Sequence, residues 1–404
     1  MDAMIRKELD TVAALEGKLH NRDFLLTWDH SDAAIRSIVV VASVLRSLAR
    51  AGLSARVFDT GLGVAIFRDN STRTRYAFRA GCNLLGLATE ELEESTSQIA
   101  HGETVRETAA MISFLTEVVG IRDDIFLGEG HRFMTEVAAS LEESAQQSVN
   151  AHRPVVLNLQ SDLDHPTQSL ADLCHLASVF GGIEALRGKT LAMSWAYSPS
   201  YGKPLSVPQG VIALMARYGM RVVLAHPEGY DLVDETLDVA RRSAAASGGS
   251  FAVVDSMAAA FEGADVVYPK SWAPVAIMRE RTRLLRAGET AGLKQLEREA
   301  LANNARFKDW ECNEALMRRT RGGQALYMHC LPADVSQVSC KEGEVSRAVF
   351  ERARLDTYRQ ASYKPFIVAA LVLCTRFADP ALVLRRLAER AVPRSQVTLP
   401  AREA

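Results

Sequence analysis

Short apolar runs rich in β-branched residues alternate with longer amphipathic stretches along this chain of 404 residues. Such alternation predicts βαβ units around parallel sheets. In the first half the pattern predicts a helix that Ser31 caps and that runs towards Gly52. The other elements expected there are a strand at 64–67, a helix at 104–119, a strand at 155–159 and a helix at 166–180.

A second series of the same kind follows. Its expected strands lie at 190–195, 221–225, 251–254, 265–268 and 325–329, with helices between them. The fold class we predict is therefore α/β, with two doubly wound parallel-sheet domains. Gly181 and Gly182 close the helix that starts at Pro166, so the domain boundary is expected near this helix, between residues 1–165 and 166–356.

Two further segments complete this prediction. An apolar helix at 357–377 is expected to pack back across both halves, which leaves 378–404 as a C-terminal tail. Residues 279–306 are charge-rich with a helical pattern, and the interpretation we favour is a solvated insertion.

Composition narrows the class of protein. With 48% hydrophobic and 24% charged residues, the chain has the composition of an ordinary globular protein. A formal net charge of -2 argues against a nucleic-acid or acidic-membrane partner, so an anionic ligand must meet locally clustered arginines. The six cysteines show no CxxC spacing and are expected to be free thiols, and no metal-ligand cluster or dinucleotide fingerprint is apparent.

The location of the protein is expected to be the cytoplasm. The first ten residues mix acids with bases and contain no apolar core typical of a secretory signal. The longest apolar run, 366–374, is about half the ~20 residues that cross a bilayer, so it is expected to be a buried helix.

The sharpest chemical signal is the segment 67–75, FRDNSTRTR, where a strand passes into a helix. Such a turn exposes backbone N–H groups and the positive end of the helix dipole, which together bind phosphate. The hydroxyls of Ser71, Thr72 and Thr74 add donors, and Arg73 adds fixed charge with bidentate geometry. The alternative is a basic helix start that faces solvent.

Two more motifs follow predicted strands. In His165-Pro166-Thr167-Gln168 the proline suits the first helical turn, and His165 and Gln168 then point into the same space. An imidazole and an amide there suit a carbonyl that bears an NH2 group, although His165 could merely cap the helix. The third motif contains Cys330, for which a buried free thiol is the alternative. Because ligands of open α/β sheets bind beyond the carboxyl ends of strands, three such motifs together indicate one site.

These motifs, STRTR at 71–75, HPxQ at 165–168 and HCLP at 329–332, resemble those of the aspartate and ornithine carbamoyltransferase superfamily. The resemblance runs from about residue 25 to 377. It implies a carbamoyl phosphate domain first, an amino-acceptor domain second, a homotrimer with active sites shared between subunits, and no cofactor.

Residue by residue, the resemblance implies the following roles. The catalytic residues are Arg122, His165 and Cys330. The residues that bind carbamoyl phosphate are Ser71, Thr72, Arg73, Thr74, Arg122, His165, Gln168, Cys330, Leu331 and Arg354. Arg354 stands in a segment that reads ARLD where the family has NRLH, so this match is looser than the others.

The acceptor differs from those of the two main branches. The DxWxSMG loop of ornithine enzymes is replaced by YPKSWAP at 268–274, and HCLP stands where aspartate enzymes have HPxPR. The proline-bearing loop at 196–209 resembles that of the knotted transcarbamylases, which implies a trefoil knot in the second domain. Within that branch the chain looks closest to a group of unassigned substrate, some of which have been connected with ureido compounds such as 2,3-diureidopropionate.

The replaced segments also give candidate acceptor residues. The wall of the acceptor pocket is expected to consist of Trp195, Tyr197, Lys270, Trp272 and Lys364. The alternative is that the tryptophans are core residues and the lysines are solvated. Gln98 is our candidate for a residue that a neighbouring subunit inserts into the site.

The expected activity is carbamoyl transfer between carbamoyl phosphate and a small amine or ureido substrate, in either direction. The alternative from another class is a non-catalytic relative that binds carbamoyl phosphate or serves as a regulatory subunit.

Overall fold

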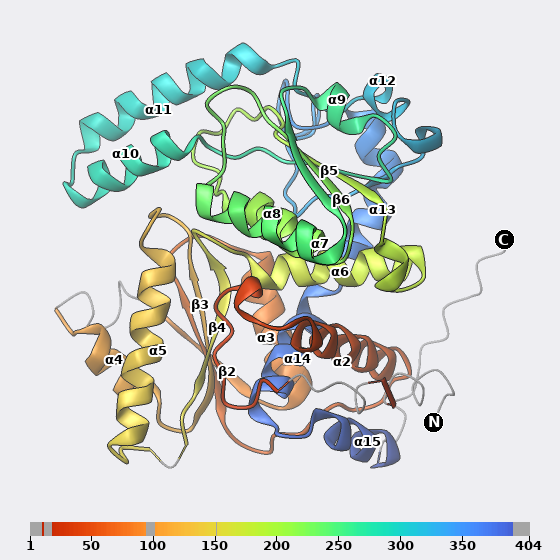
Figure 1. Ribbon diagram of the computed structural model, residues 1–404. Coiled ribbons are helices and arrows are strands. Elements are labelled where there is room, and N and C mark those ends of the chain that lie inside the picture. Colours follow the sequence, from red (N-terminus) through yellow and green to blue (C-terminus); the bar gives the residue numbers. More distant parts are fainter. Residues whose placement is uncertain (1–9, 12–17, 94–101, 151, 391–404) are drawn as a thin grey trace.

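The computed structural model describes residues 10–11, 18–93, 102–150 and 152–390, and two parallel sheets organise them (Figure 1). The strand order is β2-β1-β3-β4 in the first sheet and β7-β6-β5-β8-β9 in the second. The first sheet comprises β1 (Leu62–Phe67), β2 (Ala88–Leu92), β3 (Thr116–Asp123) and β4 (Val155–Ser161). The second comprises β5 (Thr190–Ser194), β6 (Arg221–Ala225), β7 (Ser250–Val254), β8 (Val266–Pro269) and β9 (Leu326–Tyr327).

Helices cover these sheets and join their strands. Those around the first sheet are α2 (Asp32–Arg50), α3 (Arg73–Leu85), α4 (Val105–Ile112), α5 (Gly130–Gln146) and α6 (Pro166–Phe180). Those of the second half are α7 (Ser206–Ala216), α8 (Asp234–Ser247), α9 (Met257–Phe261), α10 (Val275–Arg286), α11 (Thr290–Asn304) and α12 (Glu314–Met317). The last three are α13 (Arg347–Ala361), α14 (Lys364–Arg376) and α15 (Pro380–Arg390). Short 3-10 turns lie at Thr27–Asp29, Glu184–Leu186, Ala305–Phe307 and Arg321–Gly323.

Most of the expected elements are confirmed. Strands β4 and β8 are buried along their whole length, as strands of a parallel sheet covered on both faces should be. Ser31 caps α2 by accepting a hydrogen bond from the Ala34 backbone N–H at 3.2 Å. Helix α6 spans the predicted residues and ends at Gly181 in the left-handed conformation that glycine permits, with φ 88°.

The predicted helix at 104–119 is wrong in its second half. A capping box between Thr104 and Glu107 does start a helix, but α4 ends at Ile112. Strand β3 begins at Thr116 and pairs with both β1 and β4, so it is an inner strand of the first sheet. Sheet pairing on both sides therefore overrides the helical pattern of this segment.

The predicted single helix at 357–377 is instead two helices, α13 and α14, that meet at residues 362–363. Pro365 lies in the first turn of α14, where its missing N–H costs no helical hydrogen bond, whereas inside one continuous helix it would break the ladder. Helix α14 packs back against α2, α3 and α6 (Figure 1). At Gly81 of α3 a Cβ would lie 2.7 Å from the Pro365 carbonyl oxygen, so only glycine allows this close contact.

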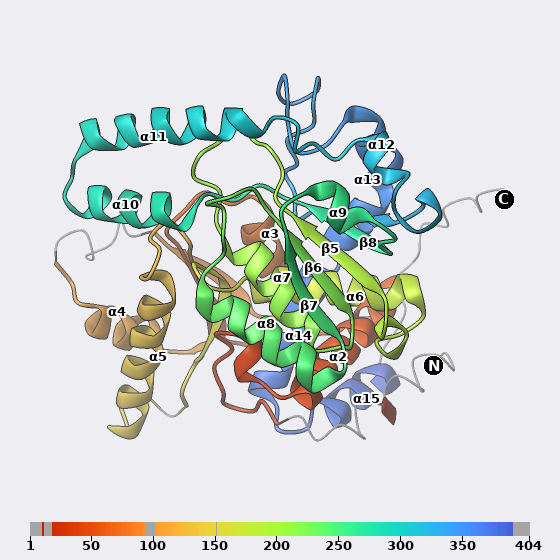
Figure 2. The same cartoon turned by 45° about the horizontal axis from the view of Figure 1, so that its top comes forward.

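No single helix within the described ranges is both long and apolar enough to cross a membrane, although the pair Arg347–Arg376 and Pro380–Glu389, bent by 116°, passes on length and composition together. The charged segment 279–306 forms most of a helical hairpin, α10 and α11, that extends along one side of the molecule (Figure 2).

Candidate active site

A cavity of about 390 Å³ lies where the carboxyl ends of strands from both sheets face each other. We call it the central cavity. Its lining residues are Asn70, Ser71, Thr72, Arg73, Thr74, Arg122, Gln160, His165, Gln168, Lys203, Pro204, Val207, Lys270, Cys330, Leu331, Pro332 and Lys364. The three sequence motifs therefore do converge on one space.

The first turns of four helices contribute to the wall of this cavity. They are those of α3 through Thr74, α6 through Gln168, α7 through Val207 and α14 through Lys364. The N-terminus of a helix carries partial positive charge and unpaired N–H groups. Their convergence makes the cavity suited to an anion even though the whole chain carries a net charge of -2.

The turn before α3 is organised by side chains that also face the cavity. The Ser71 hydroxyl accepts a hydrogen bond from the Thr74 backbone N–H at 3.2 Å. Thr72 is the N-cap residue of α3, and Arg73 is its first residue. Burial lowers the pKa of Arg73, but a guanidinium stays protonated near neutral pH, so the side chain keeps its positive charge. The geometry is that of an anion-binding turn.

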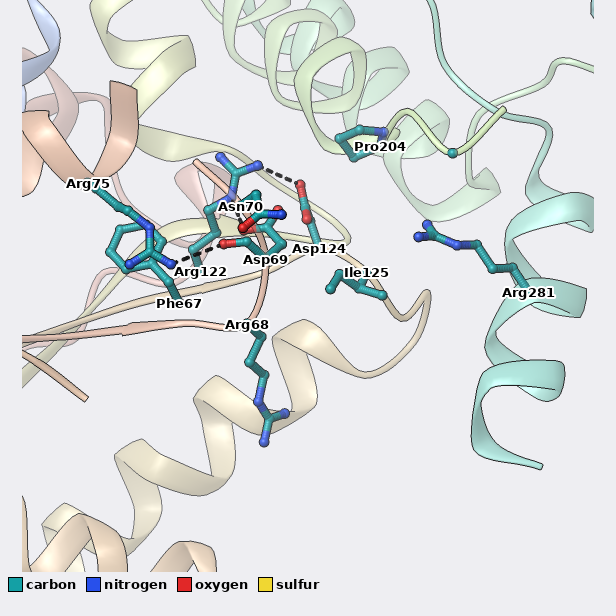
Figure 3. Close-up of a pocket in the computed structure, with 11 residues that line it drawn as sticks. Phe67, Arg68, Asp69, Asn70, Arg75, Arg122, Asp124, Ile125, Pro204 and Arg281 are labelled. Carbon is teal, nitrogen blue, oxygen red and sulfur yellow. Dashed lines mark hydrogen bonds and ion pairs between the residues drawn. The ribbon is translucent and has the colours of Figure 1, made fainter. Parts of the chain in front are cut away.

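Arg122, at the end of β3, is held in place by two carboxylates (Figure 3). Its Nε donates to Asp69 at 2.5 Å, and a terminal nitrogen lies 3.3 Å from Asp124. Its other terminal nitrogen lies 3.4 Å from the Ser71 hydroxyl and 3.3 Å from that of Thr74. Burial opposes the charge, but the two acids outweigh it and the pKa of Arg122 is raised. The guanidinium is thus fixed beside the anion-binding turn.

His165 and Lys364 meet at the inner end of the cavity. The Lys364 Nζ lies 3.1 Å from His165 Nε2 and 3.4 Å from the Thr74 hydroxyl. Burial, then Lys364 and Arg122, lower the pKa of His165 well below its usual value, so the imidazole is neutral. Burial, and then Arg122, lower the pKa of Lys364 to about 7.

The hydrogen-bond network assigns the tautomer of His165. The Thr167 hydroxyl donates to the Leu159 carbonyl oxygen at 3.1 Å, so towards His165 Nδ1, 3.3 Å away, it acts as an acceptor. The ring proton therefore sits on Nδ1, and Nε2 accepts from Lys364. Beside Nε2, Lys364 is therefore the group with N–H donors that face the cavity.

Gln168 is oriented by a buried carboxylate that the motif analysis missed. Its Nε2 donates to Asp172 at 2.7 Å, which leaves its side-chain oxygen to face the cavity. Asp172 also accepts from Gln360 at 2.6 Å and from the Tyr268 hydroxyl at 3.2 Å. Gln360 in turn accepts from the His329 backbone N–H at 3.1 Å, next to Cys330. One carboxylate thus positions both sides of the space between α6 and the HCLP loop.

The HCLP loop turns sharply into the cavity. Leu331 has φ 56°, a left-handed conformation, and its N–H donates to His329 Nδ1 at 2.9 Å. Burial raises the pKa of Cys330, so it lines the cavity as a thiol.

Two lysines line the side of the cavity that faces the second sheet. Lys203 is paired with Asp334 at 2.6 Å and with Glu344 at 3.1 Å, and it was missed by sequence reasoning. The Lys270 Nζ contacts the Ser271 carbonyl oxygen at 2.5 Å, and burial lowers its pKa. Lys270 is thus a buried cation at the cavity wall, in the place expected from the sequence.

The aromatic part of the expected acceptor wall is not at the cavity. Trp195 is fully buried, and its indole N–H donates to the Trp272 carbonyl oxygen at 2.9 Å. The Trp272 indole donates in turn to the Tyr230 carbonyl oxygen at 2.8 Å. Tyr197 is also buried, and its backbone N–H donates to the Trp310 carbonyl oxygen. Both indoles are satisfied within the core, which corrects their assignment to the pocket.

Arg354 is also placed elsewhere. It lies on an exposed face of α13, where its Nε pairs with Glu351 at 3.1 Å and its guanidinium lies over Tyr358. As an i,i+3 pair on a helix surface, this is an ordinary solvent contact, and Arg354 does not line the central cavity. Gln98 lies outside the described residues.

The comparisons with known proteins follow this geometry. The protein-family model described as "Aspartate/ornithine carbamoyltransferase, carbamoyl-P binding domain" matches residues 22–178. The one described as "Aspartate/ornithine carbamoyltransferase, Asp/Orn binding domain" matches residues 205–375. The chain therefore belongs to the aspartate/ornithine carbamoyltransferase family, which confirms the resemblance carried by its motifs.

Its relatives narrow the position within the family. The chain is 55% identical over 390 residues to the protein named "Putative carbamoyltransferase YgeW" of Escherichia coli (strain K12), which covers 96% of this chain and 98% of that one. It is 27% identical to the ornithine carbamoyltransferase of Bacillus subtilis (strain 168), over 88% of this chain and 93% of that one.

Solved structures agree on the fold. The ornithine carbamoyltransferase of Pyrococcus furiosus superposes with a TM-score of 0.70 at 24% identity, covering 89% of this chain and 98% of that one. An N-acetyl-L-ornithine transcarbamylase complexed with carbamyl phosphate and N-succinyl-L-norvaline gives 0.69 at 23% identity, covering 86% and 98%. The protein thus has the transcarbamylase fold.

Proposed function

We propose that this protein transfers a carbamoyl group between carbamoyl phosphate and an amine or ureido compound that is neither ornithine nor aspartate. The observation that carries the proposal is the central cavity itself. It joins the anion-binding turn at Ser71–Thr74, Arg122, and the Lys364–His165 pair in one space beyond the strand ends.

In this proposal the phosphate of carbamoyl phosphate binds the turn before α3, with Arg73 and Arg122 as charged donors. Lys364 donates to the carbamoyl oxygen, where negative charge develops in the tetrahedral transition state. The Gln168 side-chain oxygen accepts from the carbamoyl NH2 group, and Cys330 and Leu331 border it. The departing phosphate takes the proton of the attacking amine, so positioning and charge stabilisation do most of the work.

The acceptor side favours a carboxylate-bearing, ureido-type compound such as 2,3-diureidopropionate. Lys270 and Lys203 stand at this side of the cavity, and Lys270 contacts only a backbone oxygen among the hydrogen bonds of the described residues. A cation there repels the free ammonium of ornithine and attracts a carboxylate. The same site serves transfer to an amine and phosphorolysis of a ureido compound.

We further propose a homotrimer in which Gln98 of a neighbouring subunit completes the site, with residues 1–165 serving carbamoyl phosphate and 166–356 the acceptor. A trefoil knot at 196–209 is also part of this proposal. In its support, backbone oxygens of this loop accept from Asn304, and Lys203 in it pairs with Asp334 and Glu344. The loop is thus bound by later segments of the chain.

The test is an assay of carbamoyl phosphate against a panel of amines, run beside arsenate against a panel of ureido compounds. Turnover of a compound other than ornithine or aspartate is the expected result. If the protein binds carbamoyl phosphate but turns over nothing in either direction, the alternative of a non-catalytic relative is correct.

A further inference from the structure

A second cavity of about 440 Å³ adjoins the central cavity, and the two share Asn70, Arg122 and Pro204 as lining residues (Figure 3). We call it the distal cavity. Its remaining lining residues are Phe67, Arg68, Asp69, Arg75, Asp124, Ile125, Gly202 and Arg281. A molecule longer than carbamoyl phosphate could therefore extend past Pro204 from one space into the other.

The arginines of the distal cavity differ in their partners. Three of them come from the first half of the chain, and each is paired with a carboxylate: Arg68 with Asp123, Arg75 with Glu91, and Arg122 with Asp69. Their charges are thus compensated by the protein itself.

Arg281, on α10, is the exception. Its side chain extends from the opposite wall towards Asp124 and Pro204 (Figure 3). Within the described part of the chain its one recorded charged or ring contact is with the Tyr201 ring, 5.7 Å from the guanidinium carbon. A Cβ at Gly202 would lie 3.2 Å from the guanidinium, so the glycine leaves room for it over the loop backbone. A positioned cation without a carboxylate partner at a cavity wall marks an anion site.

The wall that faces Arg281 across the distal cavity carries carboxyl groups instead. Asp69 and Asp124 both contact Arg122, and burial, followed by the hydrogen bond between the two carboxyl groups, raises the pKa of Asp124 well above its usual value. Carboxyl oxygens on this wall can accept hydrogen bonds from N–H groups of a ligand, whereas Arg281 on the other wall can donate hydrogen bonds to an anion. The distal cavity therefore has hydrogen-bond acceptors on one wall and a cationic donor on the other.

We propose that the distal cavity is the subsite for the far end of the acceptor, and that Arg281 binds a carboxylate there. The acceptor is accordingly a compound whose carboxylate stands several bonds from the reacting nitrogen, with N–H groups between them. This inference rests on the proposed function, because it assumes that carbamoyl phosphate occupies the central cavity.

The test measures the binding of carbamoyl phosphate analogues by calorimetry, which needs no knowledge of the natural acceptor. Phosphonoacetamide reproduces the phosphate and the carbamoyl group alone. The N-phosphonoacetyl derivatives of glycine, β-alanine and γ-aminobutyrate add a carboxylate at increasing distance, and N-propyl phosphonoacetamide adds a neutral chain. The variants are Arg281→Ala, Arg281→Lys, and Arg279→Ala as a control at an exposed position on the same helix.

In the wild type, one carboxylate derivative is expected to bind at least about tenfold more tightly than the neutral propyl compound. Arg281→Ala should remove that gain, Arg281→Lys should restore part of it, and Arg279→Ala should keep it. Phosphonoacetamide should bind all four proteins equally.

Two results overturn the inference: no carboxylate derivative gains over the propyl compound in the wild type, or the gain survives in Arg281→Ala. A wild type that binds neither phosphonoacetamide nor carbamoyl phosphate would instead refute the proposed function, and the inference with it.

Discussion

The two sides of the central cavity to which we assign the phosphate and the acceptor are built in different ways. On the phosphate side, the turn at Ser71–Thr74 and the motif His165–Gln168 each follow a strand and run into the first turn of the next helix. On the acceptor side, Lys203 and Lys270 come from irregular loops whose shape depends on later segments, such as that of Glu344.

This difference explains what each side can tolerate. A strand-to-helix turn positions its N–H groups by local geometry, so its ligand class is fixed by the fold. A wall made of loops can exchange side chains without changing the sheets. Members of the family can therefore share carbamoyl phosphate as the donor and differ in the acceptor.

The sharpest way to break the phosphate side is Arg73→Ala. The variant should lose at least about 10²-fold in turnover, because it removes charge-assisted hydrogen bonds of ~1.5 to 3 kcal/mol each from the phosphate. Arg73 is exposed to the cavity, so the thermal midpoint should stay near that of the wild type. Arg79→Ala, an exposed position on the same helix that pairs with Glu91, is the control. Near-normal kinetics in Arg73→Ala would refute the anion-binding assignment.

The carbamoyl side can be separated from the phosphate side by Asp172→Asn. This change is isosteric but replaces an acceptor of two amide groups with a partial donor, so Gln168 loses its fixed orientation. The wild type should prefer carbamoyl phosphate to acetyl phosphate, which has a methyl in place of the amine, and the variant should lose about tenfold of that preference.

Inhibition by inorganic phosphate serves as the internal control for this variant. It should be unchanged, because Asp172 makes no contact with the turn at Ser71–Thr74 among its hydrogen bonds. Retained discrimination with weakened phosphate binding would mean that Asp172 only supports the fold.

The contrast also explains how far the sequence could predict the site. Arg122 and Gln168 sit in or next to local motifs, and even Asp172 could have been found, since it lies four residues after Gln168 on the same face of α6. Gln360 could not, because it reaches the site through the packing of α13. Trp195 was expected in the acceptor wall, yet its side chain is buried in the core.

The same holds for the fold. Strands such as β4 and β6 were predicted because buried parallel strands read as apolar β-branched runs. Strand β3 was not predicted. A capping box starts a helix shortly before it, and only pairing with β1 and β4 makes the following residues a strand.

Lys364 allows the buried charge of the site to be measured through pH. Its pKa is lowered from 10.5 to about 7 in the folded protein. Between these values the unfolded chain binds the proton and the folded one does not, so this group makes the unfolding free energy rise as pH rises from about 7 to 10.5. The rise, on the order of a few kcal/mol, should be missing in Lys364→Met.

The measurement is denaturant unfolding at pH 7 and pH 9.5 for the wild type, Lys364→Met and the exposed Lys294→Met. Relative to Lys364→Met, the wild type should gain unfolding free energy as the pH rises from 7 to 9.5. The pH dependence of Lys294→Met should be that of the wild type. Parallel pH profiles for all three would show that Lys364 is not a buried, neutralised amine in the ligand-free protein.

The smallest expected effect sharpens the acceptor side, where aromatic and basic residues were first assigned together. Trp195→Phe removes an N–H that satisfies the Trp272 carbonyl oxygen, so it should lower the unfolding free energy by ~1 to 3 kcal/mol and leave the acceptor KM unchanged. Lys270→Met should do the opposite, because it removes a buried charge at the cavity wall: stability is kept, and the acceptor KM rises about tenfold. Both parameters are measured on the substrate found in the panel assay. If Trp195→Phe raised that KM as much as Lys270→Met does, the indole would contribute to acceptor recognition through the core, and the division between a packed aromatic interior and a charged wall would not hold.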